Sequence, residues 1–513
     1  MIRKASDFKL NVRPILLGLE HLYYYEGPCR FGSGEALQPG YDKFANEHTS
    51  AAFMDTVRKK LPENVNLLEP IRAGRTDDWD NKAEMWEEFA KGNADADVVV
   101  FQTNIGVDDI ALEFIERYKV PVIIPPASNF SALTIRAAAK AKDPSAEVYS
   151  PIDWNAFSAL LSALRARKVI RNTNILLASR LNSDVSYSSL DTFSNHDLVT
   201  KNLGVHFRYI NVHELLDQMT PAAEGGNHTT PGRITPDLTD EDLVEANKIV
   251  DELIEGAEEV HVERKFILNS VIAYLTVRKQ MDLKDCNGFT VPCPDVCSTR
   301  RINEMQFTFC LTHSLNMESG IPSACEYDAN AVLSQQALIA VSGQRPYMGN
   351  TAPLPFENGE FLSKWGLSKE RLERLKVETG GQNLYYMKHS VPNRRFRDPN
   401  KNGRYALRHF AYDQKFGAIM RYDFEQDIDQ VITLCRFSPD GGKLLIGRGT
   451  IVGGDGYYLD NCNGVIIFRV ADQADFFQKQ TLVGNHCVIV YGDYTKELSE
   501  LASVLGIEEL KGY

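Results

Sequence analysis

Two carboxylates stand two residues apart in the middle of the chain, in the segment SACEYD at residues 323–328. Glu326 and Asp328 precede an apolar run, residues 331–341, that is typical of a buried helix. A strand-to-helix junction is a frequent place for ligand-binding carboxylates in α/β proteins. The alternative is that both residues only cap the helix, whose N-terminus favours negative charge. The spacing alone leaves both interpretations open.

Two histidines occupy comparable positions in the last third of the chain. His486 follows Gly484 and Asn485 and begins an apolar run, so it is expected at the start of a strand. His389 ends the apolar run that begins at Leu384 and precedes a loop, where functional groups often lie. Each histidine is a candidate ligand or acid/base, and each is also compatible with a purely structural role.

Several common motifs are missing from the sequence. It contains no Walker A segment, no H-E-x-x-H and no G-x-S-x-G, so the nucleotide, zinc-protease and serine-hydrolase classes are not favoured. Cys286, Cys293 and Cys297 lack the C-x-x-C spacing of zinc sites, and we do not expect these three to form a metal cluster.

The order of predicted elements supplies the framework for these residues. Expected strands at 12–17, 98–101 and 120–124 alternate with expected helices at 51–61 and 108–118, which is typical of a parallel sheet. A second alternation follows, with a helix at 154–169, a strand at 173–178, an exposed loop at 220–236 and helices at 238–258 and 266–280. After residue 350 short apolar runs alternate with Gly and Asp turns, including a hairpin turn at 438–442 and a final helix at 496–505. We therefore expect two α/β domains with mostly parallel sheets, 1–169 and 170–348, and a small antiparallel barrel or sandwich over 349–513.

Composition excludes several classes of protein. The 513 residues are 43% hydrophobic and 24% charged, which is ordinary for globular domains. The net charge of −13 argues against nucleic-acid and anionic-membrane partners. No apolar stretch is long enough to span a bilayer, the N-terminus lacks a secretion signal, and the odd number of cysteines fits a reduced, cytoplasmic protein.

Taken in order, several segments resemble the L-fucose isomerase and L-arabinose isomerase superfamily. The resemblance in motifs covers the part of the chain after Gly320, and the earlier part resembles the family by architecture. The segments that carry it are ACEYD at 324–328, GQRPYMGN at 343–350, and residues 385–392, 430–449 and 481–510, with Val12-Arg13-Pro14 near the start.

The resemblance implies a fold of two Rossmann-like α/β domains, 1–169 and 170–348, followed by a C-terminal antiparallel β-barrel domain, 349–513. It also implies a metal-dependent carbohydrate isomerase, cytoplasmic and homo-oligomeric, as a hexamer or trimer, with a sugar as its small-molecule substrate. It implies Mn²⁺, or another divalent cation such as Mg²⁺, held by two acidic residues and a histidine. By position, Glu326 matches the first acidic ligand and His486 the histidine, while the second acidic position falls on Asn350. An amide oxygen is able to ligate a hard cation, but it is neutral and does not act as a base.

This departure leaves the second acid/base group of the family's enediol chemistry unassigned. Asp328, Glu357, Glu360 and His389 are candidates to supply it. We place Glu326, Asn350 and Asp328 in the catalytic set. Donors and acceptors for sugar hydroxyls are expected at Arg13, Gln102, Asn104, Tyr347, His389 and Asn485.

Three functions follow as hypotheses. The first is aldose–ketose isomerisation of an L-fucose-like, L-arabinose-like or modified sugar. The second keeps the fold and metal site but uses the enediol for epimerisation or β-elimination, because Asn350 replaces a carboxylate. The third is a non-catalytic sugar-binding relative.

Overall fold

The structure is a computed structural model, and the residues it describes form two compact units. One unit comprises residues 8–165, and the other comprises residues 1–7 with 166–513. The division falls within helix α5 (Trp154–Arg171), whereas residues 348 and 349 both lie inside the larger unit. The described residues are 1–24, 33–76, 82–103, 106–179, 192–219, 238–354, 369–411 and 413–513.

Unit 8–165 is built on a parallel sheet. Its strands run in the order β2-β1-β4-β5-β6, and β3 pairs with β1 beside β2. The run Val98–Phe101 is fully buried, as expected for a strand that is covered on both faces. The strands are β1 (Leu10–Glu20), β2 (Val65–Leu67), β3 (Ile71–Thr76), β4 (Val98–Gln102), β5 (Val122–Ile123) and β6 (Val148–Tyr149). The predicted alternation of parallel strands and helices is confirmed for this unit.

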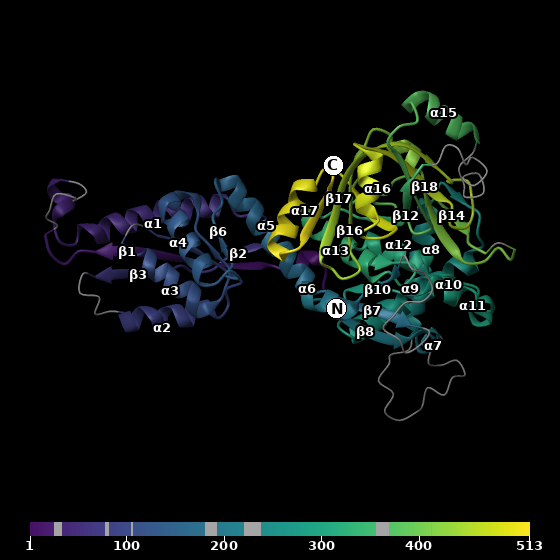
Figure 1. The fold of residues 1–513 in the computed structure, drawn as a ribbon. Helices are drawn as coiled ribbons and strands as arrows, with labels where there is room; N and C mark the ends of the chain where they lie inside the picture. The colour runs from purple at the N-terminus through teal and green to yellow at the C-terminus, as the bar shows by residue number, and fades with distance from the viewer. Residues whose placement is uncertain are drawn as a thin grey trace. The chain divides into compact units, whose positions relative to one another are not determined.

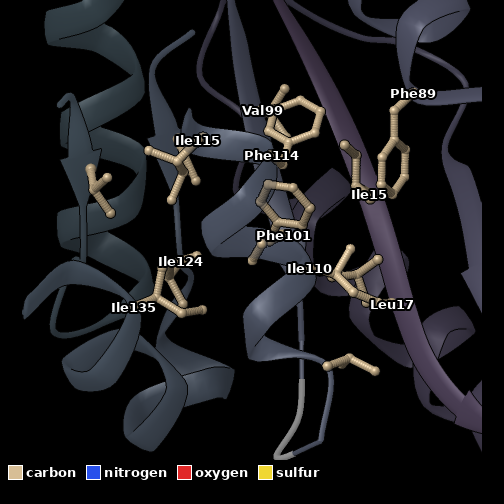
Figure 2. Close-up of a cluster of buried hydrophobic side chains, with 14 of the residues drawn as sticks. Ile15, Leu17, Phe89, Val99, Phe101, Ile110, Phe114, Ile115, Ile124 and Ile135 are labelled. Atoms are coloured by element: carbon tan, nitrogen blue, oxygen red, sulfur yellow. The ribbon is translucent and has the colours of Figure 1, made fainter. Parts of the chain in front are cut away.

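The core of this unit lies between the sheet and its helices (Figure 2). Helix α3 occupies the predicted range, Asp108–Tyr118, and buries Phe114 edge-on against Phe101 at 5.0 Å between ring centroids. Helix α1 begins ten residues before the predicted range because its first turns are polar and mostly exposed, which leaves no apolar periodicity to read. The helices before α5 are α1 (Tyr41–Lys59), α2 (Lys82–Asn93), α3 and α4 (Asn129–Lys142).

The larger unit contains a second parallel sheet, with strand order β11-β10-β7-β8. Its short strands are β7 (Asn174–Ser179), β8 (His206–Asn211), β10 (Gly288–Thr290) and β11 (Ser323–Ala324). The helices of this part are α6 (His196–Leu203), α7 (Val212–Asp217), α8 (Asp240–Gly256), α9 (Arg264–Leu283), α10 (Cys293–Cys297), α11 (Arg300–Met305), α12 (Cys310–Glu318) and α13 (Ala329–Ser342). The predicted exposed loop at 220–236 lies outside the described residues.

Helix α8 begins two residues inside the predicted range 238–258, at a capping box. The Thr239 hydroxyl accepts a hydrogen bond from the Asp242 N–H at 3.3 Å, and the Asp242 carboxylate accepts one from the Thr239 N–H at 2.7 Å. Two backbone donors at the helix end are thereby satisfied.

Loss of this cap gives a testable stability change. We expect Thr239→Ala to lower the free energy of unfolding by about 1 kcal/mol, because one N-terminal donor of α8 loses its acceptor. Thr239→Ser keeps the hydroxyl and should stay within a few tenths of a kcal/mol of the parent. Urea unfolding followed by far-ultraviolet circular dichroism measures both variants, and equal losses in the two would contradict the role of the hydroxyl.

The C-terminal part forms a closed, six-stranded antiparallel barrel (Figure 1). The strands run β16-β19-β12-β13-β18-β17, and β17 pairs with β16 to close the circle. The barrel strands are β12 (Tyr347–Pro353), β13 (Leu384–His389), β16 (Val431–Phe437), β17 (Lys443–Asp455), β18 (Gly464–Val470) and β19 (His486–Tyr491), and β20 (Glu508–Gly512) adds in parallel to β17. The accompanying helices are α15 (Lys369–Thr379), α16 (Gln473–Gln480) and α17 (Thr495–Leu505). The expected class, mixed α/β with parallel sheets and an antiparallel barrel, is confirmed.

A small third sheet of this unit was not expected from the sequence. Its strand order is β15-β14-β9, from β9 (Glu259–Val260), β14 (Tyr405–His409) and β15 (Ala418–Tyr422). Strand β9 has two residues, too few to show an alternating pattern, and its partner lies more than 140 residues further along the chain. This sheet joins the ranges 170–348 and 349–513 through backbone hydrogen bonds.

Candidate functional site

Glu326 follows the carboxyl end of β11 in a turn with a rare backbone conformation. Both Glu326 and Tyr327 are left-handed, with φ of 62° and 63°. Such a conformation costs a non-glycine residue about 1–2 kcal/mol, and two in succession persist only where the surroundings hold them. Here the Tyr327 N–H donates to the Val291 carbonyl at 3.0 Å, which fixes the turn against the end of β10.

The two predicted histidines of the barrel meet this carboxylate. His486 is the first residue of β19 and His389 the last residue of β13. Glu326 Oε2 lies 3.4 Å from His486 Nε2, and Glu326 Oε1 lies 3.4 Å from His389 Nε2. Both imidazoles are buried, with side-chain exposures of 0% and 1%. Each oxygen of one carboxylate therefore faces a different imidazole.

Asp328 has a different role from Glu326. Its Oδ1 accepts a hydrogen bond from the Ala331 N–H at 2.8 Å, which makes it the N-cap of α13. Its Oδ2 lies 2.8 Å from Arg436 Nη1 and 2.8 Å from His486 Nδ1. The helix-capping alternative thus describes Asp328 correctly but not Glu326. Asp328 touches His486 directly and is a positioning residue in this geometry.

The hydrogen bonds of the two imidazoles define opposite tautomers. Asp328 Oδ2 is an acceptor, so His486 Nδ1 carries a proton and the neutral ring directs its Nε2 lone pair toward Glu326. His389 Nδ1 accepts a hydrogen bond from the Ser390 N–H at 3.0 Å, so the proton of the neutral ring lies on Nε2. His486 therefore has the form of a metal ligand, and His389 has the form of a proton donor to Glu326 Oε1.

The charges of Glu326 and Asp328 are stabilised by the neighbouring histidines and arginine. Burial alone would raise the pKa of Glu326, but His389 and His486 oppose it and lower that pKa to about 2. Burial would likewise raise the pKa of Asp328, and Arg436 with His486 lowers it to about 2. For His486, burial favours the neutral ring, whereas the bond to Asp328 and the charge of Glu326 raise its pKa. Both carboxylates are therefore ionised near neutral pH, the form in which a carboxylate binds a divalent ion.

Asn350 lies beside His486 in the barrel. The two residues are direct partners of β12 and β19, so their side chains share one face of the sheet. The Asn350 Oδ1 accepts a short hydrogen bond from Asn485 Nδ2, and Asn485 Oδ1 in turn accepts one from the Thr351 N–H at 3.0 Å. This chain fixes the amide orientation and leaves one lone pair of the Asn350 oxygen for another donor or a cation.

The geometry fits a divalent ion between Glu326 and His486. Two donor atoms about 2.1 Å from one ion lie about 3.0–3.4 Å apart when the angle at the ion is about 90–109°. The 3.4 Å between Glu326 Oε2 and His486 Nε2 matches this spacing, and both atoms present lone pairs when the His486 ring is neutral. Glu326, His389 and Cys325 also place ligand atoms within 4.8 Å of one another, but the tautomer of His389 favours a donor role for that ring.

The other predicted residues belong to the other unit, have structural partners or lie outside the described residues. Arg13 and Gln102 belong to unit 8–165, where Arg13 Nη1 donates to the Glu69 carbonyl at 2.5 Å and Gln102 Oε1 accepts from Ser50 Oγ at 2.8 Å. Tyr347 is buried and donates to the carbonyls of His389 and Gly464, both at 3.2 Å. Asn104, Glu357 and Glu360 lie outside the described residues.

Sequence reasoning missed two features of the site. Arg436, the next-to-last residue of the apolar strand β16, is 1% exposed and donates to Asp328 and to the His486 carbonyl, the latter at 2.7 Å. Its isolation among apolar neighbours was an available signal, because a buried arginine needs a partner. The second feature is a group formed by Cys293, His313 and Cys325. The sequence led us to consider Cys293 only together with Cys286 and Cys297. Among the described residues, Cys286 and Cys297 do not lie in a possible metal-ligand group with Cys293.

The fold and this geometry define a mixed α/β protein with a candidate metal centre between a parallel-sheet loop and one end of a β-barrel. No protein-family model matches the chain, and no curated protein is significantly similar to it. Within the described residues, none of the helices has the length and apolar character needed to cross a bilayer.

Proposed function

We propose that this protein is a metal-dependent carbohydrate isomerase that interconverts an aldose and a ketose through an enediol. One observation carries the proposal: Asp328 orients His486 so that its Nε2 faces a carboxylate whose other oxygen faces a second imidazole. Moving a proton between adjacent carbons requires a base, a proton donor and an electrophile at the two substrate oxygens. The arrangement supplies candidates for all three.

The two oxygens of Glu326 suit two different tasks. Oε2 faces His486 and would hold the ion together with His486 Nε2. The Asn350 oxygen would be the third ligand, through the lone pair that Asn485 does not use. Oε1 faces His389 Nε2 and would exchange a proton with the substrate carbon, with His389 as the second acid/base group. When bound, a divalent ion would polarise the two substrate oxygens and stabilise the developing negative charge.

The donor set also bears on which ion is bound. One carboxylate, one amide oxygen and one imidazole suit Mn²⁺ better than Mg²⁺, since Mg²⁺ prefers oxygen donors and imidazole suits transition ions. The proposal keeps the other features implied by the family resemblance: three domains divided at 169 and 348, a homo-oligomer and a cytoplasmic location. It also keeps a small-molecule sugar as the substrate, with no nucleic-acid or membrane partner.

The proposal is tested with full-length protein that is first stripped of metal. We expect that added Mn²⁺ restores aldose–ketose conversion across a panel of aldoses, and that hydrogen at C2 exchanges with deuterium in D₂O, detected by proton NMR. Deuterium exchange detects proton abstraction even where the equilibrium favours the starting aldose and little ketose accumulates. Absence of both conversion and exchange, in protein that binds Mn²⁺, would contradict an enzyme of this class and favour a non-catalytic sugar-binding protein.

A second candidate function rests on Asn350. Its neutral amide stands beside His486 where the resembled family has a carboxylate, and its oxygen is already engaged by Asn485. A site with one carboxylate fewer lacks the family's second base at this position. The enediol would then be open to reprotonation at the original carbon from the other face, which is epimerisation, or to loss of a leaving group from the neighbouring carbon, which is β-elimination. Product analysis of the exchanging sugars separates these outcomes from isomerisation.

Asn350→Asp distinguishes the two functions. The carboxylate keeps the acceptor for Asn485 and adds a negative charge, so we expect the Mn²⁺ affinity to rise roughly tenfold. If Asn350 is a specialisation for a different reaction, the rate on the native substrate should not rise. A faster native reaction in the variant would show instead that the asparagine only weakens an ordinary isomerase site. Titration calorimetry and steady-state rates measure the two effects separately.

A further inference from the structure

A second group of potential ligands lies next to the Glu326 turn. The Sγ atoms of Cys293 and Cys325 and a ring nitrogen of His313 all lie within 4.8 Å of one another. The three residues are 7%, 4% and 0% exposed. They come from three elements: the start of α10 beyond β10, the middle of α12, and the turn between β11 and α13. Three separate segments thus converge on one small volume with soft donor atoms.

His313 is held in the orientation that this group needs. Its Nε2 lies 3.7 Å from Cys293 Sγ, and its Nδ1 lies 2.8 Å from Ser323 Oγ. Ser323 is itself fixed, because Gln335 accepts from its N–H at 2.6 Å and donates to its carbonyl at 3.1 Å. The Ser323 Oγ also accepts from Asn316 Nδ2 at 3.3 Å. Metal-binding histidines commonly have their other ring nitrogen bonded in this way.

We propose that Cys293, His313 and Cys325 form a soft-metal site that takes Zn²⁺ or an ion of the same class. In a tetrahedral zinc site sulfur and nitrogen ligands lie about 3.6 Å apart and two sulfurs about 3.8 Å apart, from bond lengths of about 2.3 and 2.0 Å. The observed 3.7 Å between Cys293 Sγ and His313 Nε2 matches the first value. Two thiolates and an imidazole select zinc over Mn²⁺ or Mg²⁺, so this site and the Glu326 site differ in the ion they take.

The position of Cys325 gives this site a structural task. Cys325 directly precedes Glu326, and Glu326 and Tyr327 are the two left-handed residues of the turn. An ion shared with α10 and α12 would tie Cys325 to two further segments and hold the strained turn in place. The site therefore positions Glu326 without touching a substrate, and its existence does not depend on the proposed isomerase activity.

The experiment uses the full-length protein with Co²⁺ as a spectroscopic probe and Zn²⁺ as the competitor. We expect Co²⁺ to give an intense thiolate-to-cobalt charge-transfer band, and Zn²⁺ to abolish it while Mn²⁺ does not. His486→Gln should leave the band unchanged, because that residue belongs to the other site. Absence of a charge-transfer band in the parent protein would overturn the proposal, and would leave the three residues as a hydrogen-bonded group only.

Variants then assign the ligands. Cys293→Ser should lower zinc affinity by roughly 100-fold or more, and Ser323→Ala, which removes the support of His313 and the acceptor of Asn316 Nδ2 but leaves both thiols in place, by about 10–100-fold. Cys435→Ser is the matched control, since Cys435 is a buried thiol of the barrel that contacts the Ser334 carbonyl at 3.5 Å. Unchanged zinc affinity in Cys293→Ser would contradict the assignment. Should that variant fail to fold, Ser323→Ala still tests the assignment, because unchanged zinc affinity in that variant would contradict a role for His313.

Discussion

Replacing Glu326 with glutamine is expected to lower the rate of the proposed isomerisation by about 10²–10⁴, the usual contribution of a positioned acid or base. The glutamine has nearly the same shape, but it carries no charge to attract a cation beside His486 and takes no proton from carbon. Because Oε1 and Oε2 face different imidazoles at 3.4 Å, one substitution removes both tasks. We therefore expect the Mn²⁺ affinity and the deuterium exchange at C2 to fall together.

The contrast with His389→Gln sharpens this prediction. His389 faces only Oε1 and has the tautomer of a proton donor, so its loss should reduce the rate while the Mn²⁺ affinity stays close to that of the parent. Calorimetric metal titrations and exchange rates, measured on both variants, separate the two effects. Full activity in Glu326→Gln would remove the basis of the proposed function.

Asp328→Asn is expected to lower the free energy of unfolding by about 3–5 kcal/mol, because it leaves a buried guanidinium without its counter-ion. Asp328 and Arg436 are 0% and 1% exposed and lie 2.8 Å apart. Asparagine still caps α13 well, so the loss does not come from the helix end. The weaker acceptor for His486 Nδ1 should also reduce Mn²⁺ affinity by about 10–100-fold.

A matched pair elsewhere in the same unit provides the control. Glu318 and Arg394 are also buried, at 6% and 8% exposure, and lie 2.8 Å apart. Glu318→Gln should destabilise the protein by a similar amount and leave the metal affinity unchanged. Chemical unfolding and metal titration of both variants test this. If Glu318→Gln weakens Mn²⁺ binding as much as Asp328→Asn does, the role of Asp328 is stability alone.

Local sequence signals were sufficient for much of the framework. Apolar strands that alternate with amphipathic helices predicted the parallel sheets, and the bounds of α3 and the capping box of α8 follow from residues within one or two turns. The turn at 438–442 separates β16 and β17 as expected. These features depend on interactions between residues close in the chain, so the sequence reveals them.

Barrel closure and the third sheet depend on distant partners. Strand β16 pairs with both β17 and β19, and β9 pairs with β14 across a long separation. Neither pairing leaves a periodic trace in one segment, because the strands that pair are chosen by how all the elements pack. The same limit applies to Cys293, His313 and Cys325, which converge from three elements with no shared motif.

The sequence by itself determined which side chains were available for chemistry: two carboxylates at a strand-to-helix junction and two histidines at strand ends. Only the tertiary structure decided which of these side chains faces which partner. Asp328 caps the helix and orients His486, while the left-handed turn directs Glu326 to both imidazoles. The physical reason is that a side chain's direction depends on its backbone conformation and on partners more than 60 residues away, such as His389 and His486.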